Sequence, residues 1–410
     1  MLHGNAIVGQ SGGPTAAINA TLAGVIRGVL ACAEIPTLYG ALNGVEGMLS
    51  DRVCNLSAVC RTEEDLTCLE NTPAAALGSC RLKLPKKGEG EETYQKLFAF
   101  FEKYDIRYFF YIGGNDSMDT VDKVSAYAQK TGYEIRVVGV PKTIDNDVMG
   151  TDHTPGYGSA AKYIAVSVQE MLRDCAVYTV PAVTIVEIMG RDAGWLTAAA
   201  ALPVAGCGAA PDLIYLPERT FSFDAFFSDV RAALQRHPNV MVAVSEGLRC
   251  ADGTYVGESA QSGATDVFGH KYLSGTGKAL EIAVKEKIGC KVRSVELNIL
   301  QRCASHIASK TDLDESVMVG RATVEAALSG VSGEMMTLVR TSDDPYTVVA
   351  GHADIRKIAN QVRCVPDAFI NEAGNHVTQA CIDYILPMIQ GEPQPLYRRG
   401  LPVHFVVEKE

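Results

Sequence analysis

Two short segments of this sequence place glycine, carboxylate, lysine and threonine side chains directly after apolar runs. Residues 111–117 have the sequence YIGGNDS, and residues 141–147 have the sequence PKTIDND. The preceding runs, 106–112 and 135–140, are rich in β-branched and aromatic residues, which is typical of buried strands in a parallel sheet. The sequence therefore predicts two strands that deliver a glycine turn and a charged loop to the same place.

The side chains of these two loops suit chemistry on a phosphate group. Gly113 and Gly114 leave backbone N–H groups open to an anion, and a following helix would add its positive N-terminal end. Asp145 and Asp147 can hold a cation or take a proton, and Lys142 supplies a compact positive charge. This combination favours phosphoryl transfer.

A pattern of strand, turn and helix recurs along the chain. It occurs at residues 6–31, 106–129 and 183–202, and a further strand is predicted at 240–244. Strands and helices that alternate at this spacing form βαβ units around mainly parallel sheets. Ligands bind outside the carboxyl ends of such strands, so we expect the loops that follow them to line one cleft.

The length of 410 residues favours two domains. Glycine and proline residues at 150–158 mark a break in regular structure. We expect one domain from residues 1–155 plus about 310–385, and a second from residues 156–309 plus about 386–410. The predicted fold is α/β, with two doubly wound, mainly parallel sheets and the active site in the cleft between them.

Composition argues against several classes of partner and location. The net charge is −11 at pH 7, which disfavours binding to nucleic acid or to an anionic membrane. No stretch approaches the length of apolar residues that spans a bilayer, and no N-terminal segment combines a basic start with an apolar core. The 12 cysteines include no C-x-x-C pair, so we expect reduced thiols and a cytoplasmic location.

The segments GGNDS and PKTIDND together resemble the phosphofructokinase family, and within it the pyrophosphate-dependent branch. The resemblance continues in the family's order through GQSGGP at 9–14, LGSCR at 77–81, MGRDAGW at 189–195, SEG at 245–247 and QR at 301–302. It covers roughly the first three-quarters of the chain. It implies that the first domain binds the phosphoryl donor, that the second binds fructose 6-phosphate, and that Mg²⁺ is the cofactor.

The resemblance also implies a role for each matching residue. Asp145 is then the base that removes the proton of the sugar hydroxyl, and Lys142 and Asp116 are the other catalytic residues. The residues implied to bind diphosphate are Gly13, Gly113, Gly114, Arg81 and Lys142. The residues implied to bind the sugar phosphate are Thr143, Ile144, Asp145, Met189, Gly190, Arg191, Glu246 and Arg302. The residues implied to hold Mg²⁺ are Asn115, Asp116 and Asp147.

The partners that the resemblance implies are fructose 6-phosphate, pyrophosphate and further copies of this chain. An arginine that corresponds to Arg302 is often lent across a subunit interface in this family. A homodimer or a homotetramer is therefore expected, with the substrate arginine shared between subunits.

Asp116 and Lys142 favour pyrophosphate over ATP as the donor. In ATP-using relatives the pair at positions 115 and 116 resembles Asp-Gly, and the glycine leaves room for the α-phosphate. A like-charge contact about 4 Å long costs around 4 kcal/mol at an effective dielectric near 20, so we expect Asp116 to disfavour ATP by about a thousandfold. Asn115 departs from the aspartate that usually accompanies the metal, so the residues that complete the metal shell stay open.

Three alternatives remain at this point. The first is the same enzyme with ATP as donor, or with sedoheptulose 7-phosphate as a further acceptor. The second is a nicotinamide-dependent oxidoreductase, which the absence of G-x-G-x-x-G after the first strand disfavours. The third is a catalytically silent sugar-phosphate sensor, against which the presence of both Asp145 and Lys142 argues.

Overall fold

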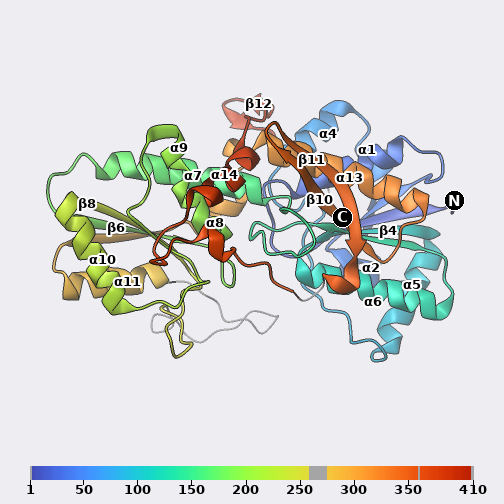
Figure 1. The fold of residues 1–410 in the computed structure, drawn as a ribbon. Helices are drawn as coiled ribbons and strands as arrows, with labels where there is room; N and C mark the ends of the chain where they lie inside the picture. The colour runs from blue at the N-terminus through green and yellow to red at the C-terminus, as the bar shows by residue number, and fades with distance from the viewer. Residues whose placement is uncertain (1, 258–274, 359–360, 408–410) are drawn as a thin grey trace.

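The computed structural model describes residues 2–257, 275–358 and 361–407. Two α/β domains lie side by side, each with a central sheet covered by helices on both faces (Figure 1). The larger sheet has seven strands in the order β11-β10-β5-β4-β1-β2-β3, and the smaller has four in the order β7-β8-β6-β9. The predicted fold class, two doubly wound and mainly parallel sheets, is confirmed.

The first sheet is parallel in its centre and antiparallel at both edges. Strands β1, β2, β4, β5 and β10 are paired in parallel, whereas β3 and β11 run antiparallel to β2 and β10. Its strands are β1 (Asn5–Gln10), β2 (Leu38–Ala41), β3 (Val53–Asn55), β4 (Ile106–Gly113), β5 (Arg136–Pro141), β10 (Glu334–Asp343) and β11 (Tyr346–Asp354). The glycine turn and the charged loop therefore leave adjacent strands, β4 and β5, as predicted.

Alternation along the strands explains why this sheet has helices on both faces. Tyr108 and Phe110 pack with α1 and α13, whereas Phe109 and Tyr111 face the core beneath α5 and α6. The helices of this domain are α1 (Ile18–Leu30), α2 (Gly44–Leu49), α3 (Leu56–Val59), α4 (Glu63–Glu70), α5 (Glu91–Lys103), α6 (Asn115–Thr131) and α13 (Lys310–Ser329).

The four strands of the second sheet all run parallel. They are β6 (Ala182–Ile188), β7 (Leu213–Tyr215), β8 (Asn239–Ser245) and β9 (Lys291–Glu296). Its helices are α7 (Tyr157–Cys175), α8 (Trp195–Ala198), α9 (Pro203–Cys207), α10 (Phe223–Arg236), α11 (Thr276–Lys287), α12 (Leu300–Cys303) and α14 (Gln379–Ile385). One face packs on α7, α8 and α14, and the other packs on α10 and α11.

The C-terminal part of the chain crosses between the domains more often than we expected. Apolar residues of the segment 365–388 join the core of the second domain, although we assigned residues up to 385 to the first. Phe405 and Val407 then pack against the core of the first domain, although we assigned them to the second. The reason is packing: the segment covers the face of the second sheet around Trp195, and the tail fills a gap beside α4.

Short elements complete the structure. They are a C-terminal hairpin, β12 (Tyr397–Arg398) and β13 (Leu401–Pro402), and single 3-10 turns at Ala199–Ala201, Ser305–Ile307, Ile355–Lys357, Asp367–Phe369 and Leu386–Ile389. Among the helices that the structure describes, none is long and apolar enough to cross a membrane.

Helices α1 and α13 approach each other closely because glycines face each other at the contact. A Cβ atom at Gly24 would lie 2.2 Å from the carbonyl oxygen of Val317, and one at Gly320 would lie 2.2 Å from that of Thr21. Helix α1 begins just after the Gly12-Gly13 turn, and Asp312 of α13 accepts hydrogen bonds from the backbone N–H groups of Gly156 and Ser159. The contact between the two helices therefore supports the loops at the cleft.

We expect Gly320→Ala to lower the free energy of unfolding by about 1–3 kcal/mol, because an added methyl group must push the two helices apart. Thermal unfolding, followed by circular dichroism, measures this. Gly206→Ala is the matched control, since that helical glycine has open space, its nearest neighbour being 3.9 Å away. The control should be neutral or slightly stabilising, because Ala is the better helix former. Equal melting temperatures for both variants would contradict the packing argument.

Candidate active site

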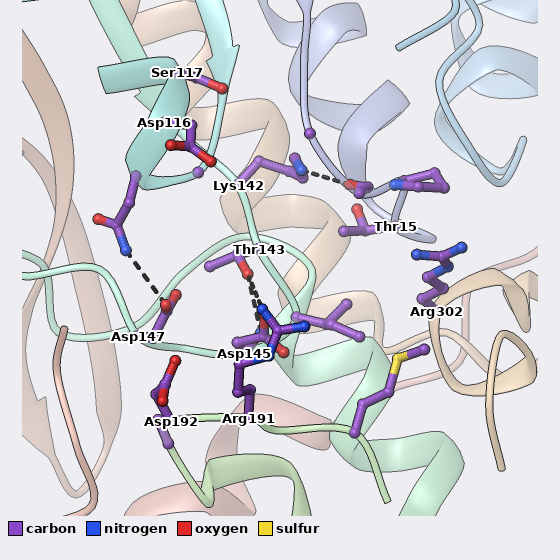
Figure 2. Close-up of a pocket in the computed structure, with 18 of the residues that line it drawn as sticks. Thr15, Asp116, Ser117, Lys142, Thr143, Asp145, Asp147, Arg191, Asp192 and Arg302 are labelled. Atoms are coloured by element: carbon purple, nitrogen blue, oxygen red, sulfur yellow. Dashed lines mark hydrogen bonds between the residues drawn. The ribbon is translucent and has the colours of Figure 1, made fainter. Parts of the chain in front are cut away.

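A cavity of about 460 Å³ lies between the two domains, at the carboxyl ends of the strands. It collects most of the residues that the sequence predicted. The predicted residues that line it are Gly13, Arg81, Gly114, Asn115, Asp116, Lys142, Thr143, Ile144, Asp145, Asp147, Met189, Arg191, Glu246 and Arg302. Figure 2 shows that their side chains come from loops on both sides of the cleft.

Gly113 and Gly190 do not line this cavity. A Cβ atom at Gly113 would lie 1.9 Å from Oγ of Ser117, so this glycine lets β4 turn tightly into α6. Gly190 has φ +138, and a Cβ atom there would lie 2.5 Å from the carbonyl oxygen of Ala193. Both glycines shape the loops. We expected both to form part of the cavity wall, and neither does.

Lys142 is the buried cation of the site. Its side chain reaches across from β5 to the glycine turn after β1, where Nζ donates a hydrogen bond to the carbonyl oxygen of Gly13 at 2.5 Å (Figure 2). The residue is only 2% exposed. Burial lowers the pKa of Lys142 to about 8, although Asp145 and Asp147 oppose this shift. The ammonium is therefore charged at neutral pH and directed at the wall that contains Gly12 and Gly13.

The loop after β5 is bent by Asn146, and the bend lets two aspartates face one cavity. Asn146 has φ +53, in the left-handed region, and its side-chain oxygen accepts a hydrogen bond from the backbone N–H of Thr154 at 3.1 Å. Asn tolerates this conformation better than most residues because its short polar side chain bonds locally. Asp145 and Asp147, which flank it, consequently both line the cavity.

Burial and mutual repulsion disfavour the charged forms of these two aspartates. The pKa of Asp145 is raised by burial, while the charge of Lys142 and a hydrogen bond from Thr143 oppose the shift. Burial and the charge of Asp145 raise the pKa of Asp147 to about 7. Asp192 adds a further negative charge from the opposite domain, and Figure 2 shows it pointing toward Asp147. A carboxylate with a raised pKa is a better proton acceptor near neutral pH.

Asn115 and Asp147 fit a cation that arrives with a phosphate ligand. Nδ2 of Asn115 donates to Oδ2 of Asp147 at 3.3 Å, and the buried Oδ1 of Asn115 has no hydrogen-bond partner. Within residues 2–257, 275–358 and 361–407, no group of three His, Cys, Asp or Glu side chains is arranged to hold a metal. This is compatible with Mg²⁺, which often takes one or two protein oxygens and completes its shell with water and phosphate.

The side of the cavity that the second domain forms is built on the loops after β6 and β8. The backbone N–H of Met189 donates to the side-chain oxygen of Gln301, and that of Gly190 donates to Oε1 of Glu246, each at 3.3 Å. Burial, together with the charge of Asp145, raises the pKa of Glu246 to about 8. The loop that contains Arg191 is thus held against Glu246 and against the segment that carries Arg302.

Arg302 lines the cavity of its own chain. Its Nη1 atom lies 3.6 Å from the position that a Cβ atom would take at Gly13. Helix α12 follows β9, and this connection directs Arg302 into the cleft of its own chain; sharing of this arginine with a neighbouring subunit stays a prediction.

Asp116 lines the part of the cavity that the first domain forms, and it is paired with Lys83, whose Nζ lies 3.0 Å from Oδ1. Both side chains are nearly half exposed, at 47% for Lys83 and 45% for Asp116. Lysine and solvent therefore screen the charge of Asp116, and a Coulomb penalty of the size expected from the sequence is too large. If Asp116 disfavours a bulkier donor, as we expect from the sequence, the volume of its carboxylate then matters more than its charge.

Sequence reasoning missed several residues of the cavity wall. They are Ser11, Gly12, Pro14, Thr15, Ser117, Asp192, Ala193 and Val362. Six of them lie inside a recognised motif but were given no role, and Thr15 directly follows one, so the motifs themselves were the signal that could have found them. Val362 has no such signal, because it lies far along the chain from every other residue of the site.

The segment 361–365 joins both sides of the cleft. Val362 pairs with Val148 in an antiparallel bridge, and the backbone N–H of Arg363 donates to the carbonyl oxygen of Asp147 at 2.8 Å. The carbonyl oxygen of Arg363 accepts from Nε1 of Trp195 at 2.9 Å, and its guanidinium lies 4.5 Å from the centre of that ring. This segment thus connects the loop that contains Asp145 and Asp147 to the loop after Arg191.

The fold and the site define a two-domain α/β enzyme that transfers phosphoryl groups in the cleft between its domains. The family model of phosphofructokinase matches residues 5–327. The chain belongs to the phosphofructokinase family.

Relatives match over nearly the full length. A protein of Halomonas elongata named pyrophosphate–fructose 6-phosphate 1-phosphotransferase is 41% identical over an alignment 410 residues long, which covers 98% of this chain and 96% of that protein. One with the same name from Xanthomonas campestris pv. campestris is 42% identical over 405 residues, with the same coverage of both chains. The crystal structure of a pyrophosphate-dependent phosphofructokinase from Nitrosospira multiformis is similar with a TM-score of 0.89 at 37% identity, and covers 99% of this chain and 97% of that one.

We expect Asp147→Asn to raise the melting temperature at pH 8. The pKa of Asp147 is about 7 in the folded protein against 3.8 for an unperturbed aspartate, so the folded state binds this proton more tightly than the unfolded chain. Ionisation of Asp147 therefore costs stability, and the cost is absent below about pH 4 and grows until the pH passes the folded-state pKa. The gain in the variant should accordingly shrink as the pH falls from 8 to 4.

Differential scanning calorimetry across this pH range measures the effect. Asp314→Asn is the control, because that carboxylate is exposed and forms only a surface ion pair with Lys310. It should give no gain at pH 8. A gain for Asp147→Asn that is the same at pH 4 and pH 8 would show that burial of the charge is not its cause.

Proposed function

We propose that this chain transfers a phosphoryl group from pyrophosphate to the 1-hydroxyl of fructose 6-phosphate, and that it also runs in reverse from fructose 1,6-bisphosphate and phosphate, in glycolysis and gluconeogenesis in the cytoplasm. The observation that carries this proposal is the pair of charges on the donor side. Buried Lys142 is held at the Gly12-Gly13 turn, and Asp116 lines the same cavity after the neighbouring strand. Two relatives that are 41% and 42% identical to this chain are named pyrophosphate–fructose 6-phosphate 1-phosphotransferase.

On the donor side, the proposed ligands of diphosphate are Gly13, Gly114, Arg81 and Lys142. Gly13 and Gly114 leave backbone open to the cavity, and Arg81 reaches the same space. Lys142 and Arg81 would neutralise the phosphoryl oxygens while the terminal group is transferred. The first domain would thus bind the donor, and the second would bind the sugar.

For the proton transfer, we assign Asp145 as the base and Thr143 as the residue that orients it. Oγ1 of Thr143 donates to Oδ2 of Asp145 at 3.3 Å. When the 1-hydroxyl oxygen attacks the phosphorus, its proton would pass to Asp145, and the same carboxyl would return the proton in the reverse reaction. Arg191 and Arg302 would anchor the 6-phosphate, with Met189, Ile144 and Glu246 against the sugar.

Mg²⁺ is the cofactor that the site would accept, held by Asp147 and Asn115. Of the three Mg²⁺ ligands that the sequence suggested, Asn115, Asp116 and Asp147, Asp116 is the least suitable because it is already paired with Lys83. A bound Mg²⁺ supplies charge neutralisation at the phosphate oxygens. The support for this assignment is the unpartnered Oδ1 of Asn115 beside Asp147.

We also propose that the chain forms a homodimer or a homotetramer. Exposed apolar side chains lie near both ends of the edge strand β9: Val177, Tyr178 and Val180 precede β6 beside its start, and Ile299 and Leu300 follow its end. An open strand edge with exposed apolar side chains at its ends suits a surface that another chain covers. The mass of the protein in solution tests this directly.

We expect Asp145→Asn to lower kcat by roughly 10²–10⁴ with a much smaller change in KM, because the variant keeps the shape of the side chain and removes the base. Steady-state rates with fructose 6-phosphate, pyrophosphate and Mg²⁺ measure this in both directions. Asp314→Asn serves again as a control at an exposed position. Retention of most of kcat in Asp145→Asn would refute the assignment of the base.

Pyrophosphate should exceed ATP in kcat/KM by at least tenfold in the unaltered protein. Since Lys83 and solvent screen Asp116, we expect the block against ATP to be steric in large part. Asp116→Gly should therefore raise the ratio of ATP to pyrophosphate activity, even if total activity falls. Lys83→Met removes only the charge partner and should change this ratio far less. An unaltered protein that uses ATP as well as pyrophosphate would overturn the proposed donor.

A further inference from the structure

Glu187 is a buried carboxylate close to the sugar side of the cleft that no step of the proposed reaction uses. It lies on β6 two residues before Met189, and it is only 4% exposed. A buried charge is costly unless polar groups compensate it. The structure provides that compensation at one place, the N-terminus of α11.

Two backbone N–H groups hold the carboxylate of Glu187. That of Gly275 donates to Oε1 at 3.1 Å, and that of Gly277 donates to Oε2 at 2.7 Å. A Cβ atom at Gly277 would lie 3.2 Å from Oε2, so the absence of a side chain there allows the close approach. Each of the two oxygens therefore fixes one residue at the start of α11.

The residue between these two contacts reaches the loop that contains Glu246. Oγ1 of Thr276 donates to the carbonyl oxygen of Glu246 at 3.0 Å, and Thr276 is fully buried. The backbone N–H of Glu246 in turn donates to the carbonyl oxygen of Ile188 at 2.9 Å. A chain of hydrogen bonds thus runs from the side chain of Glu187 through Thr276 to the backbone of Glu246.

A second connection starts from the backbone of Glu187. Its carbonyl oxygen accepts from the N–H of Leu297 at 3.1 Å, at the start of the segment that leads to Arg302. Glu187 therefore contacts both segments that flank the sugar side of the cavity, although it does not line the cavity itself.

We infer that Glu187 is a positioning residue for sugar-phosphate binding: its carboxylate fixes the N-terminus of α11, and through Thr276 it sets the position of Glu246. The inference rests on the proposed function, because it assigns Glu246 to the sugar. It predicts that loss of the carboxylate weakens binding of fructose 6-phosphate and leaves the donor side, which lies in the other domain, unchanged.

The charged surroundings of Glu187 give a second prediction. Glu296 is its partner on the adjacent strand β9, and Glu246 lies on the loop after β8. Burial, supported by the charge of Glu296, raises the pKa of Glu187 to about 7. A protonated carboxyl accepts one hydrogen bond fewer at the start of α11, so the affinity for the sugar should fall as the pH falls through this range.

Glu187→Gln tests the inference, because the amide has the same shape and can accept only one of the two N–H bonds. We expect KM for fructose 6-phosphate to rise about tenfold, while KM for pyrophosphate stays within twofold and kcat within threefold. Glu296→Gln is the matched control, since it removes the same charge from the opposing position on β9 and holds no residue of α11. The control should leave both KM values within twofold.

Thr276→Val tests the next step of the same path. The variant has the same shape but lacks the hydroxyl that donates to Glu246, so KM for fructose 6-phosphate should rise about threefold. Thr276→Ser should restore the value of the unaltered protein. Because both changes act through one path, the double variant with Glu187→Gln should be clearly less impaired than the product of the two single effects.

The outcomes separate this inference from the proposed function. Calorimetric titration of the full-length protein with fructose 6-phosphate alone should show about tenfold weaker binding for Glu187→Gln, without any turnover. Equal affinity in the two proteins would overturn the inference, and so would a parallel rise of both KM values with a fall in melting temperature. If the unaltered protein does not bind fructose 6-phosphate at all, the proposed function fails instead.

Discussion

The ammonium group of Lys142 is the charge around which the cleft is arranged. It is removed from water and held by a carbonyl oxygen of the Gly12-Gly13 turn, so it connects the ends of β1 and β5. Its field counteracts the burial that would otherwise neutralise Asp145 and Asp147. The three charges are therefore linked: the cation favours the ionised forms of the two aspartates, and the aspartates favour the charged form of the lysine.

Local patterns of the sequence were sufficient to predict the central part of the molecule. The apolar runs before Gly113 and Lys142 became adjacent strands of a parallel sheet, and parallel strands necessarily bring their carboxyl-end loops together. The motifs around Arg191 and Glu246 reached the same cavity for the same reason. Resemblance to a family added the roles of these residues, which periodicity alone does not reveal.

What could not be predicted depends on contacts between residues far apart in the chain. Glu187 looks like an ordinary position in a strand, and only the structure places the start of α11 against it. Arg302 turns into its own cleft because of how α12 follows β9. The ion pair of Lys83 with Asp116 reduces the expected effect of the charge of Asp116 relative to that of its volume. Neither the spacing nor the type of these two residues predicts this pair.

The segment 361–365 has a consequence for the folding of this protein during its synthesis. Every recognised motif lies before it in the chain, and the match to the family model ends at residue 327. Yet Asp147 and Trp195 share hydrogen bonds with Arg363, which leaves the ribosome long after both of them. A nascent chain that already contains all the proposed site residues therefore still lacks the segment that connects its two halves. The contacts that join the two halves of the cleft can therefore form only after residues 361–365 have been synthesised, later than the last motif.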